Sequence, residues 1–328
     1  MSKGISTALQ TALEEFGSIP FVDFCRIALY DPIDGYYSQT RHRVGADRQS
    51  DFVTNLAVKS VFAPLVLHAV RTLLEGREMG GYRFLEIAAE PDQSLLSEVD
   101  HPFLRADVVR LGDPIPVLDG PTVLFANEWL DAQPFVRLVF REGQWQESFV
   151  RKSDTGELEE VFSPPDSADA CSLLENLPAE APEGYRLDLS VEADSVLKSY
   201  LDQDWEGLFL TFDYGSSWEA LVNSLPGGTG RAYYSHQQSS DLLAQPGQQD
   251  LTANVCWDRI ASVLKSYSFA VGGPHRQEAF FLEKSSAGIR AMVEGGDSAE
   301  ARGKRSKLMQ LLNPAHFGAA FQAMWGIR

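Results

Sequence analysis

Three short apolar runs, with segments of helical spacing around them, constrain the fold of this chain most. The runs are residues 83–88, 122–127 and 207–215, and each is rich in Leu, Ile, Val or Phe. Strands that alternate with helices predict an α/β fold with a mostly parallel sheet. Two later runs, SFAVGG and EAFFLEK, look like paired strands. They favour an antiparallel edge near the C-terminus.

Polar side chains gather where these runs end. Glu86 lies in the first run, Asn127 and Glu128 end the second, and Asp213 lies near the end of the third. Ligands of open α/β sheets bind beyond the carboxyl ends of the strands. Acidic groups there can hold ribose hydroxyls, an amine or a guanidinium. The alternative is that Asn127 and Glu128 begin a helix and Asp213 caps a turn, but three such ends together favour a common site.

The rest of the chain predicts additions to this sheet. Residues 1–80 contain helical spacing, including an apolar run at 57–75, and we expect a helical N-terminal region that packs on the core. Residues 81–328 then form the α/β domain. FVRLVF and WQESFV flank a Gly-containing turn, which is typical of a β-hairpin. With the polar stretch 151–184, this hairpin predicts an insertion over about 135–184.

The charge of the chain bears on its partners. There are 28 Lys and Arg against 46 Asp and Glu, which gives a formal net charge of −18. Such a field repels nucleic acid and anionic membranes and attracts basic proteins. We therefore expect a basic protein substrate or assembly partner, no nucleic acid and no membrane. The oligomeric state stays open, with a homodimer as one option.

Several other classes are disfavoured by missing patterns. Cys25, Cys171 and Cys256 are far apart and form no CxxC, so neither a disulfide framework nor a metal site is expected. No G-x-S-x-G motif or P-loop occurs. The first residues lack a signal-peptide core, and Glu14 and Glu15 disfavour a transit peptide. The expectation is a cytoplasmic protein.

An ordered set of short motifs spans residues 21–321. It comprises ALYDPIDGYY, SDFVTNLAV, NEWLDAQP, the DYG at 213–215, GTGRAYYSH, PGQQDLTANV, QEAFFL and PAHFGAAF. The set resembles the MidA-type S-adenosylmethionine-dependent methyltransferases. That family includes the mitochondrial complex I assembly factor that methylates a protein arginine.

The resemblance implies a Rossmann-like class I methyltransferase sheet, S-adenosylmethionine as cofactor and a protein arginine as substrate. It also implies roles for residues of the matching motifs. The cofactor contacts would be Tyr37, Asp51, Thr54, Glu86, Ala88, Glu90, Asn127 and Glu128. The catalytic carboxylates would be Glu128, Asp131 and Asp213.

The chain departs from the family at the first strand. The family has a glycine-rich E-x-G-x-G-x-G turn, and this chain has EIAAEPDQ. Alanine in place of glycine requires a negative φ or strain of about 1 kcal/mol. Pro91 removes an N–H donor, and Glu90 brings a negative charge towards the cofactor. Only about 33 residues separate the first two strands, where the family fits two more strands.

Three hypotheses stay open from the sequence. The first is a methyltransferase that acts on a protein arginine. The second is an inactive binding or assembly protein, because the cofactor turn has lost its glycines. The third is an enzyme with another small ligand in the same crevice. The acid that would hold the cofactor ribose has no clear counterpart, and Asp107 and Asp113 are the candidates.

Overall fold

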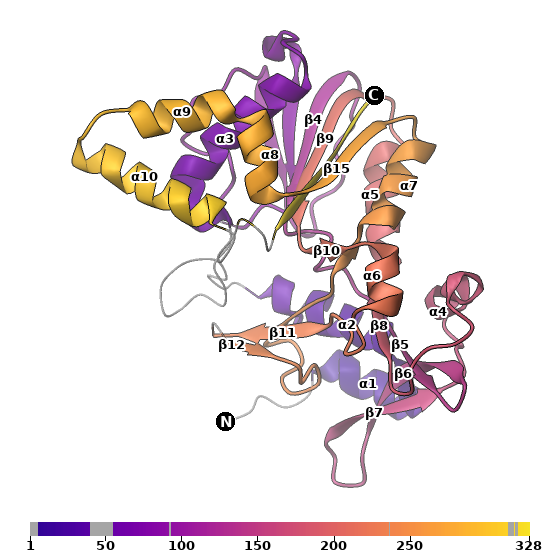
Figure 1. The fold of residues 1–328 in the computed structure, drawn as a ribbon. Helices are drawn as coiled ribbons and strands as arrows, with labels where there is room; N and C mark the ends of the chain where they lie inside the picture. Colours follow the sequence, from indigo (N-terminus) through magenta and orange to yellow (C-terminus); the bar gives the residue numbers. More distant parts are fainter. Residues whose placement is uncertain (1–5, 40–54, 92, 236, 314–317, 319–320) are drawn as a thin grey trace.

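The computed structural model describes residues 6–39, 55–91, 93–235, 237–313, 318 and 321–328. The chain forms a mixed α/β fold around a six-stranded sheet, with a second sheet next to its N-terminal helices (Figure 1). The α/β class expected from the sequence is confirmed.

The six-stranded sheet has the order β15–β16–β9–β4–β2–β3. Its strands are β2 (Arg83–Ile87), β3 (Arg105–Val109), β4 (Pro121–Asn127), β9 (Glu206–Asp213), β15 (Ala270–Arg276) and β16 (Gln322–Ile327). The neighbours from β3 to β9 pair in parallel, whereas β16 is antiparallel to both β9 and β15. Strand β16 therefore lies one position in from the edge of the sheet. It runs opposite to its two neighbours, β15 and β9, which point in the same direction.

Alternate residues of the central strands bury into two different cores. Phe84 and Phe125 face one core, and Leu85 and Leu124 face the other. The first face is covered by α3 (Lys59–Leu73), α8 (Gln277–Lys284), α9 (Ser286–Glu294) and α10 (Ala299–Leu312), and the second by α5 (Glu192–Leu201) and α7 (Trp257–Ser266) (Figure 1). Each fully buried Phe or Leu contributes roughly 1.5–3 kcal/mol to this packing.

The prediction of a strand over EAFFLEK is wrong, because this segment is helix α8. Phe280 and Phe281 pack from α8 onto Phe212 of the sheet, with ring centroids 5.3 Å apart in both pairs. Short apolar runs do not distinguish a buried helix from a strand by periodicity. The partner of β15 is instead β16.

The connection between β2 and β4 is short, as the spacing predicted. In the described part of residues 88–120, β3 is the one strand and there is no α-helix. Turns occupy residues 95–98. The sheet therefore ends at β3 on this side.

Helix α3 is both long and apolar. The stretch Asn55–Leu73, which joins the 3-10 turn η2 (Asn55–Val58) to α3, is long and apolar enough to cross a membrane. Half of its most apolar window is buried inside the fold. Phe62 of α3 packs against Phe125 and Phe212 of the sheet, as a core helix does.

The second sheet carries the predicted hairpin. Strands β5 (Val136–Arg141) and β6 (Gln144–Lys152) pair antiparallel, which confirms the hairpin. The other strands are β1 (Ser18–Pro20), β7 (Leu158–Ser163) and β8 (Arg186–Leu189), and the helices that pack here are α1 (Thr7–Phe16), α2 (Phe21–Tyr30), α4 (Ala168–Leu173) and α6 (Trp218–Asn223). Helices α1 and α2 pack on this second sheet, whereas α3 packs on the six-stranded sheet. The boundary between an N-terminal helical region and the α/β domain near residue 80 stays a prediction.

Short elements complete the described chain. They are η1 (Tyr36–Ser38), η3 (Met79–Gly81), η4 (Leu174–Asn176), β10 (Gly215–Ser216), β11 (Arg231–Tyr234), β12 (Gln237–Ser239), β13 (Asp250–Thr252) and β14 (Val255–Cys256). Strands β11, β12 and β13 form a small antiparallel sheet. Asp250 of β13 accepts a hydrogen bond from the hydroxyl of Tyr37 in η1, which places β13 next to η1.

Candidate functional site

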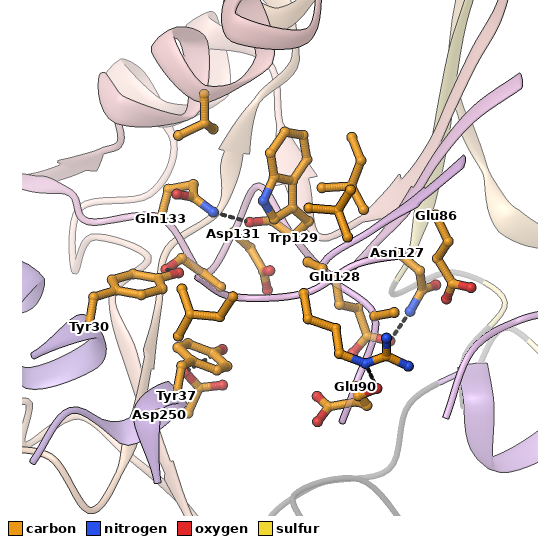
Figure 2. A pocket seen from close by; sticks show the side chains of 18 of the residues that line it. Tyr30, Tyr37, Glu86, Glu90, Asn127, Glu128, Trp129, Asp131, Gln133 and Asp250 are labelled. Carbon is orange, nitrogen blue, oxygen red and sulfur yellow. Dashed lines mark hydrogen bonds between the residues drawn. The ribbon is translucent and has the colours of Figure 1, made fainter. Parts of the chain in front are cut away.

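A pocket of about 1270 Å³ opens at the carboxyl ends of β2, β3 and β4. It has two regions, which we call the sheet end and the tyrosine end. The sheet end is lined by Glu86–Pro91, Val109–Asp113, Ile115 and Asn127–Trp129. The tyrosine end is lined by Tyr30, Tyr37, Tyr214 and Tyr233, with Asp131 and Asp250. Figure 2 shows Tyr30, Tyr37 and Asp250 on one side of Asp131, and Glu86, Glu90 and Asn127 on the other.

The turn after β2 keeps a left-handed residue although it has no glycine. Ala88 has φ 58° and lines the pocket. The next residue, Ala89, donates its N–H to the Val109 carbonyl oxygen at 3.2 Å, which ties the turn to β3. An alanine at this turn could adopt either a negative φ or the strained left-handed conformation, and Ala88 adopts the left-handed one. An L-residue in this region costs roughly 1–2 kcal/mol.

Glu86 is a buried carboxyl at the base of the sheet end. Its side chain is on β2, and its Oε2 accepts the Leu95 N–H at 2.6 Å. Burial raises the pKa of Glu86 from its ordinary 4.5 to about 7, although the Leu95 N–H and the charges of Lys59 and Arg110 oppose the rise. Glu86 therefore titrates near neutral pH.

The strand end at Asn127 and Glu128 repeats the left-handed geometry. Glu128 has φ 53°, and its N–H donates to the Phe212 carbonyl oxygen at 2.9 Å. Its carboxylate accepts a hydrogen bond from Asn127 Nδ2 at 2.7 Å. Burial raises the pKa of Glu128 well above its ordinary value. Strained backbone of this kind concentrates at functional sites.

Three side-chain amides, those of Asn55, Asn127 and Gln277, hold this strand end. Asn55 Nδ2 donates to Asn127 Oδ1 and to Gln277 Oε1, both at 3.0 Å. Gln277 returns a hydrogen bond to Asn55 Oδ1 at 3.1 Å and is fully buried. The Asn55 backbone N–H also donates to the Glu128 carboxylate. Gln277, at the start of α8, thus helps to orient Asn55, which in turn holds the Glu128 carboxylate.

Asp213 lies beneath the loop that follows Glu128. Its Oδ2 accepts the backbone N–H groups of Trp129, Leu130 and Asp131 at 3.1, 2.8 and 3.3 Å. Its Oδ1 accepts the Tyr214 N–H at 2.8 Å, and the side chain is fully buried. Asp213 does not line the pocket. This is the turn-capping alternative raised by the sequence.

Asp131 connects Asp213 to the pocket. The two carboxyl groups share a hydrogen bond, and burial raises the pKa of both, that of Asp213 to about 6. Two buried carboxyls in contact cannot both ionise cheaply. The pair therefore holds a shared proton between its two carboxyl groups more tightly than an isolated aspartate would, and Asp131 is the member of the pair that lines the pocket.

The tyrosine end is aromatic and acidic. The rings of Tyr30 and Tyr37 stack with centroids 5.4 Å apart. The Tyr37 hydroxyl donates to Asp250 at 2.9 Å, and the Tyr30 hydroxyl donates to the Ala132 carbonyl oxygen at 3.0 Å. Burial raises the pKa of Tyr214, and the carboxylates of Glu128 and Asp131 add to the rise. Tyrosine faces beside carboxylates are the usual surroundings of a bound cation.

The structure brings most of the sequence-predicted residues into this pocket. Those that line it are Tyr37, Glu86, Ala88, Glu90, Asn127, Glu128 and Asp131. Asp51 and Thr54 lie outside the described residues. Of the two ribose candidates, Asp113 lines the pocket, whereas Asp107 pairs with Arg83 and Arg105 and does not.

Sequence reasoning missed several residues of the lining. Tyr214, Tyr233 and Asp250 belong to the DYG, GTGRAYYSH and PGQQDLTANV motifs, so the motifs themselves could have indicated them. Arg110 directly follows β3 and had no such signal. Among the described residues, no group of three His, Cys, Asp or Glu side chains is placed to hold a metal ion.

Comparison with known proteins gives consistent findings. Residues 83–275 match the family model "Putative S-adenosyl-L-methionine-dependent methyltransferase". Two curated relatives carry the name Protein arginine methyltransferase NDUFAF7 homolog, mitochondrial. The one from Caenorhabditis elegans is 23% identical over 319 residues, which cover 81% of this chain and 73% of the relative. The one from Drosophila melanogaster is 22% identical over 377 residues, which cover 97% and 83%.

Solved structures match over nearly the whole chain. A COG1565 superfamily member from Burkholderia thailandensis, bound to S-adenosyl-homocysteine, has a TM-score of 0.85 at 23% identity, and covers 98% of this chain and 91% of that one. A native structure of an uncharacterized COG1565 superfamily protein from the same organism has a TM-score of 0.81 at 22% identity, with 98% and 90% covered. These likenesses establish the shared fold.

Proposed function

Because the chain belongs to this family of methyltransferases, with S-adenosylmethionine as cofactor, we propose that it transfers a methyl group to an arginine side chain of a protein. The observation that carries this proposal is the shape of the pocket. One continuous space joins the turn after β2 to an acidic, tyrosine-lined end. The curated relatives are named protein arginine methyltransferases, which supports the same substrate class.

The sheet end fits S-adenosylmethionine chemically. Apolar side chains suited to an adenine ring line it, namely Ile87, Val109, Leu111, Ile115 and Trp129. The carboxyl groups of Glu86 and Glu90 suit an ammonium group, and Arg110 is available to an anionic group. The methyl of Ala88 narrows the turn but leaves its left-handed backbone in place. When bound, the cofactor supplies an electrophilic methyl group on a sulfonium.

The tyrosine end suits a guanidinium. Tyr30, Tyr37, Tyr214 and Tyr233 offer ring faces, and a cation over an aromatic ring gains roughly 0.5–2 kcal/mol. Asp131 of the tyrosine end and Glu128 of the sheet end lie where the two ends of the pocket meet (Figure 2). A carboxylate pair can hold the planar fork of a guanidinium and so aim one nitrogen towards the sheet end.

The raised pKa of Glu128 suits a group that takes up the proton released in the reaction. Methylation forms a nitrogen–carbon bond, breaks the sulfur–carbon bond and releases one proton from the guanidinium. Glu128 has a carboxylate whose pKa is raised by burial, so it accepts a proton more readily than an exposed glutamate. We assign Glu128 as the proton acceptor and Asp131 as an orienting group. Asp213 is a positioning residue, because its oxygens hold the backbone of residues 129–131.

The test separates cofactor binding from methyl transfer. Calorimetry with S-adenosylhomocysteine measures binding to the full chain. Mass spectrometry then follows methyl transfer to two matched peptide libraries, one with a central Arg and the other with a central Lys. We expect binding, and methylation of the Arg library alone.

Two variants assign the roles. Glu128→Gln should lower methyl transfer by roughly 100-fold or more while S-adenosylhomocysteine affinity changes much less. The surface variant Glu78→Gln should leave both unchanged. Binding without transfer to either library would favour the assembly-protein hypothesis. An intact fold without binding would refute the proposal.

A further inference from the structure

The pocket has one cationic side chain among its described lining residues, and that residue is Arg110. Every other charged side chain there is acidic. These are Glu86, Glu90, Asp113, Glu128, Asp131, Glu192 and Asp250. An anionic part of a ligand therefore has a single favourable place among the described residues, at the carboxyl end of β3.

The contacts of Arg110 leave much of its guanidinium available. Its Nε donates to the Glu90 carbonyl oxygen at 3.3 Å. Its backbone N–H donates to Asp113 Oδ2 at 2.8 Å, so this carboxylate caps the turn rather than pairing with the side chain. Within the described chain, Nη1 and Nη2 of Arg110 have no hydrogen-bond or ion-pair partner. Arg105 on the same strand differs, because it pairs with Asp107 outside the pocket.

The position of Arg110 in the sheet indicates which part of a ligand these donors would meet. Strand β3 is the neighbour of β2, whose turn lines the same pocket. In nucleotide-binding α/β sheets, an acidic residue near this place accepts hydrogen bonds from ribose hydroxyls, whereas an arginine accommodates a phosphate on the ribose. A guanidinium is donor-only and matches phosphate oxygens in a bidentate way.

We propose that Arg110 makes the end of β3 an anion-binding subsite, through which the pocket accepts adenine nucleosides that carry a phosphate on the ribose. Such ligands would compete with the cofactor for the pocket. The proposal rests on the proposed function in one respect, namely that the sheet end takes an adenosine group.

The experiment is a calorimetric comparison of adenosine with its 2′-, 3′- and 5′-monophosphates on the full chain. In the wild type, a 2′- or 3′-phosphate should tighten binding by about ten-fold or more over adenosine, as a charge-assisted bidentate contact does. Arg110→Ala should abolish this gain, and Arg110→Glu should turn it into a loss. The matched control Arg105→Ala should retain it.

Three results would overturn the inference. They are equal binding of adenosine and its ribose phosphates to the wild type, an undiminished gain in Arg110→Ala, and a loss of S-adenosylhomocysteine affinity in Arg110→Ala with methylthioadenosine affinity unchanged. The last would mean that Arg110 holds the cofactor carboxylate. Binding of S-adenosylhomocysteine to the wild type is scored separately and tests the proposed function alone. Circular dichroism confirms that each variant is folded.

Discussion

Replacement of Glu86 by glutamine removes a buried titrating group and keeps its shape. Glu86 is 3% exposed, and burial raises its pKa from 4.5 to about 7. The folded protein therefore binds this proton more tightly than the unfolded chain. Its contribution to stability is complete below pH 4.5 and is lost as the pH rises through 7. A shift of this size corresponds to about 3 kcal/mol.

Urea denaturation of the wild type and Glu86→Gln measures this contribution. In the difference between the two free energies of unfolding, the pH-dependent contributions of the other titrating groups cancel, provided that these groups keep their environments. We expect the wild type to lose about 3 kcal/mol relative to the variant between pH about 4 and pH about 8. The control variant Glu78→Gln removes an exposed carboxylate far from the pocket.

A difference that stays constant over this pH range would refute the reasoning. It would mean that Glu86 is solvated in the folded protein. The base of the sheet end would then be open to water rather than closed. A difference of the opposite sign would mean that the carboxylate is stabilised by Lys59 and Arg110 more than burial opposes it.

Three further variants test the geometry of the loop and turn. Asp213→Ala should cost roughly 3–5 kcal/mol of unfolding free energy, because four backbone N–H groups, three of them buried, lose their acceptor. A cost below about 1 kcal/mol in urea denaturation would contradict this. Ala88→Gly should leave the thermal midpoint unchanged or raise it, since glycine accepts φ 58° without strain, whereas Ala89→Gly, at a buried position without positive φ, should cost about 1 kcal/mol. Gln277→Leu should lower methyl transfer more than cofactor binding, because Asn55, which holds the strand end at Glu128, then loses its hydrogen bonds to Gln277. Turnover and calorimetry measure the two losses, and equal losses would point to a general loss of stability.

Residues with a strong local pattern could be predicted from the sequence. The runs at 83–88, 122–127 and 207–215 became β2, β4 and β9, and the turn between FVRLVF and WQESFV became a hairpin. Their apolar content and turn residues carry the information locally. Three of their polar ends were also expected to meet, and Glu86 and Glu128 do share one pocket.

Features decided by distant contacts could not be predicted. Residues 278–284 form a helix because Phe280 and Phe281 pack on the sheet face. Residues 322–327 form a strand because β9 offers them a free edge. For Asp213 the sequence left two roles open, a catalytic one and a turn cap, and the choice depends on the backbone N–H groups that the folded loop brings to its carboxylate.

The placement of β16 has a consequence for how the protein is made. Residues 322–327 join β9 to β15, so this side of the sheet is assembled from segments that are synthesised far apart. While a ribosome is still producing the preceding helices, β9 exposes an unpaired, apolar edge, and β15 has no neighbour to join. Nascent chains at this stage are open to edge-to-edge association.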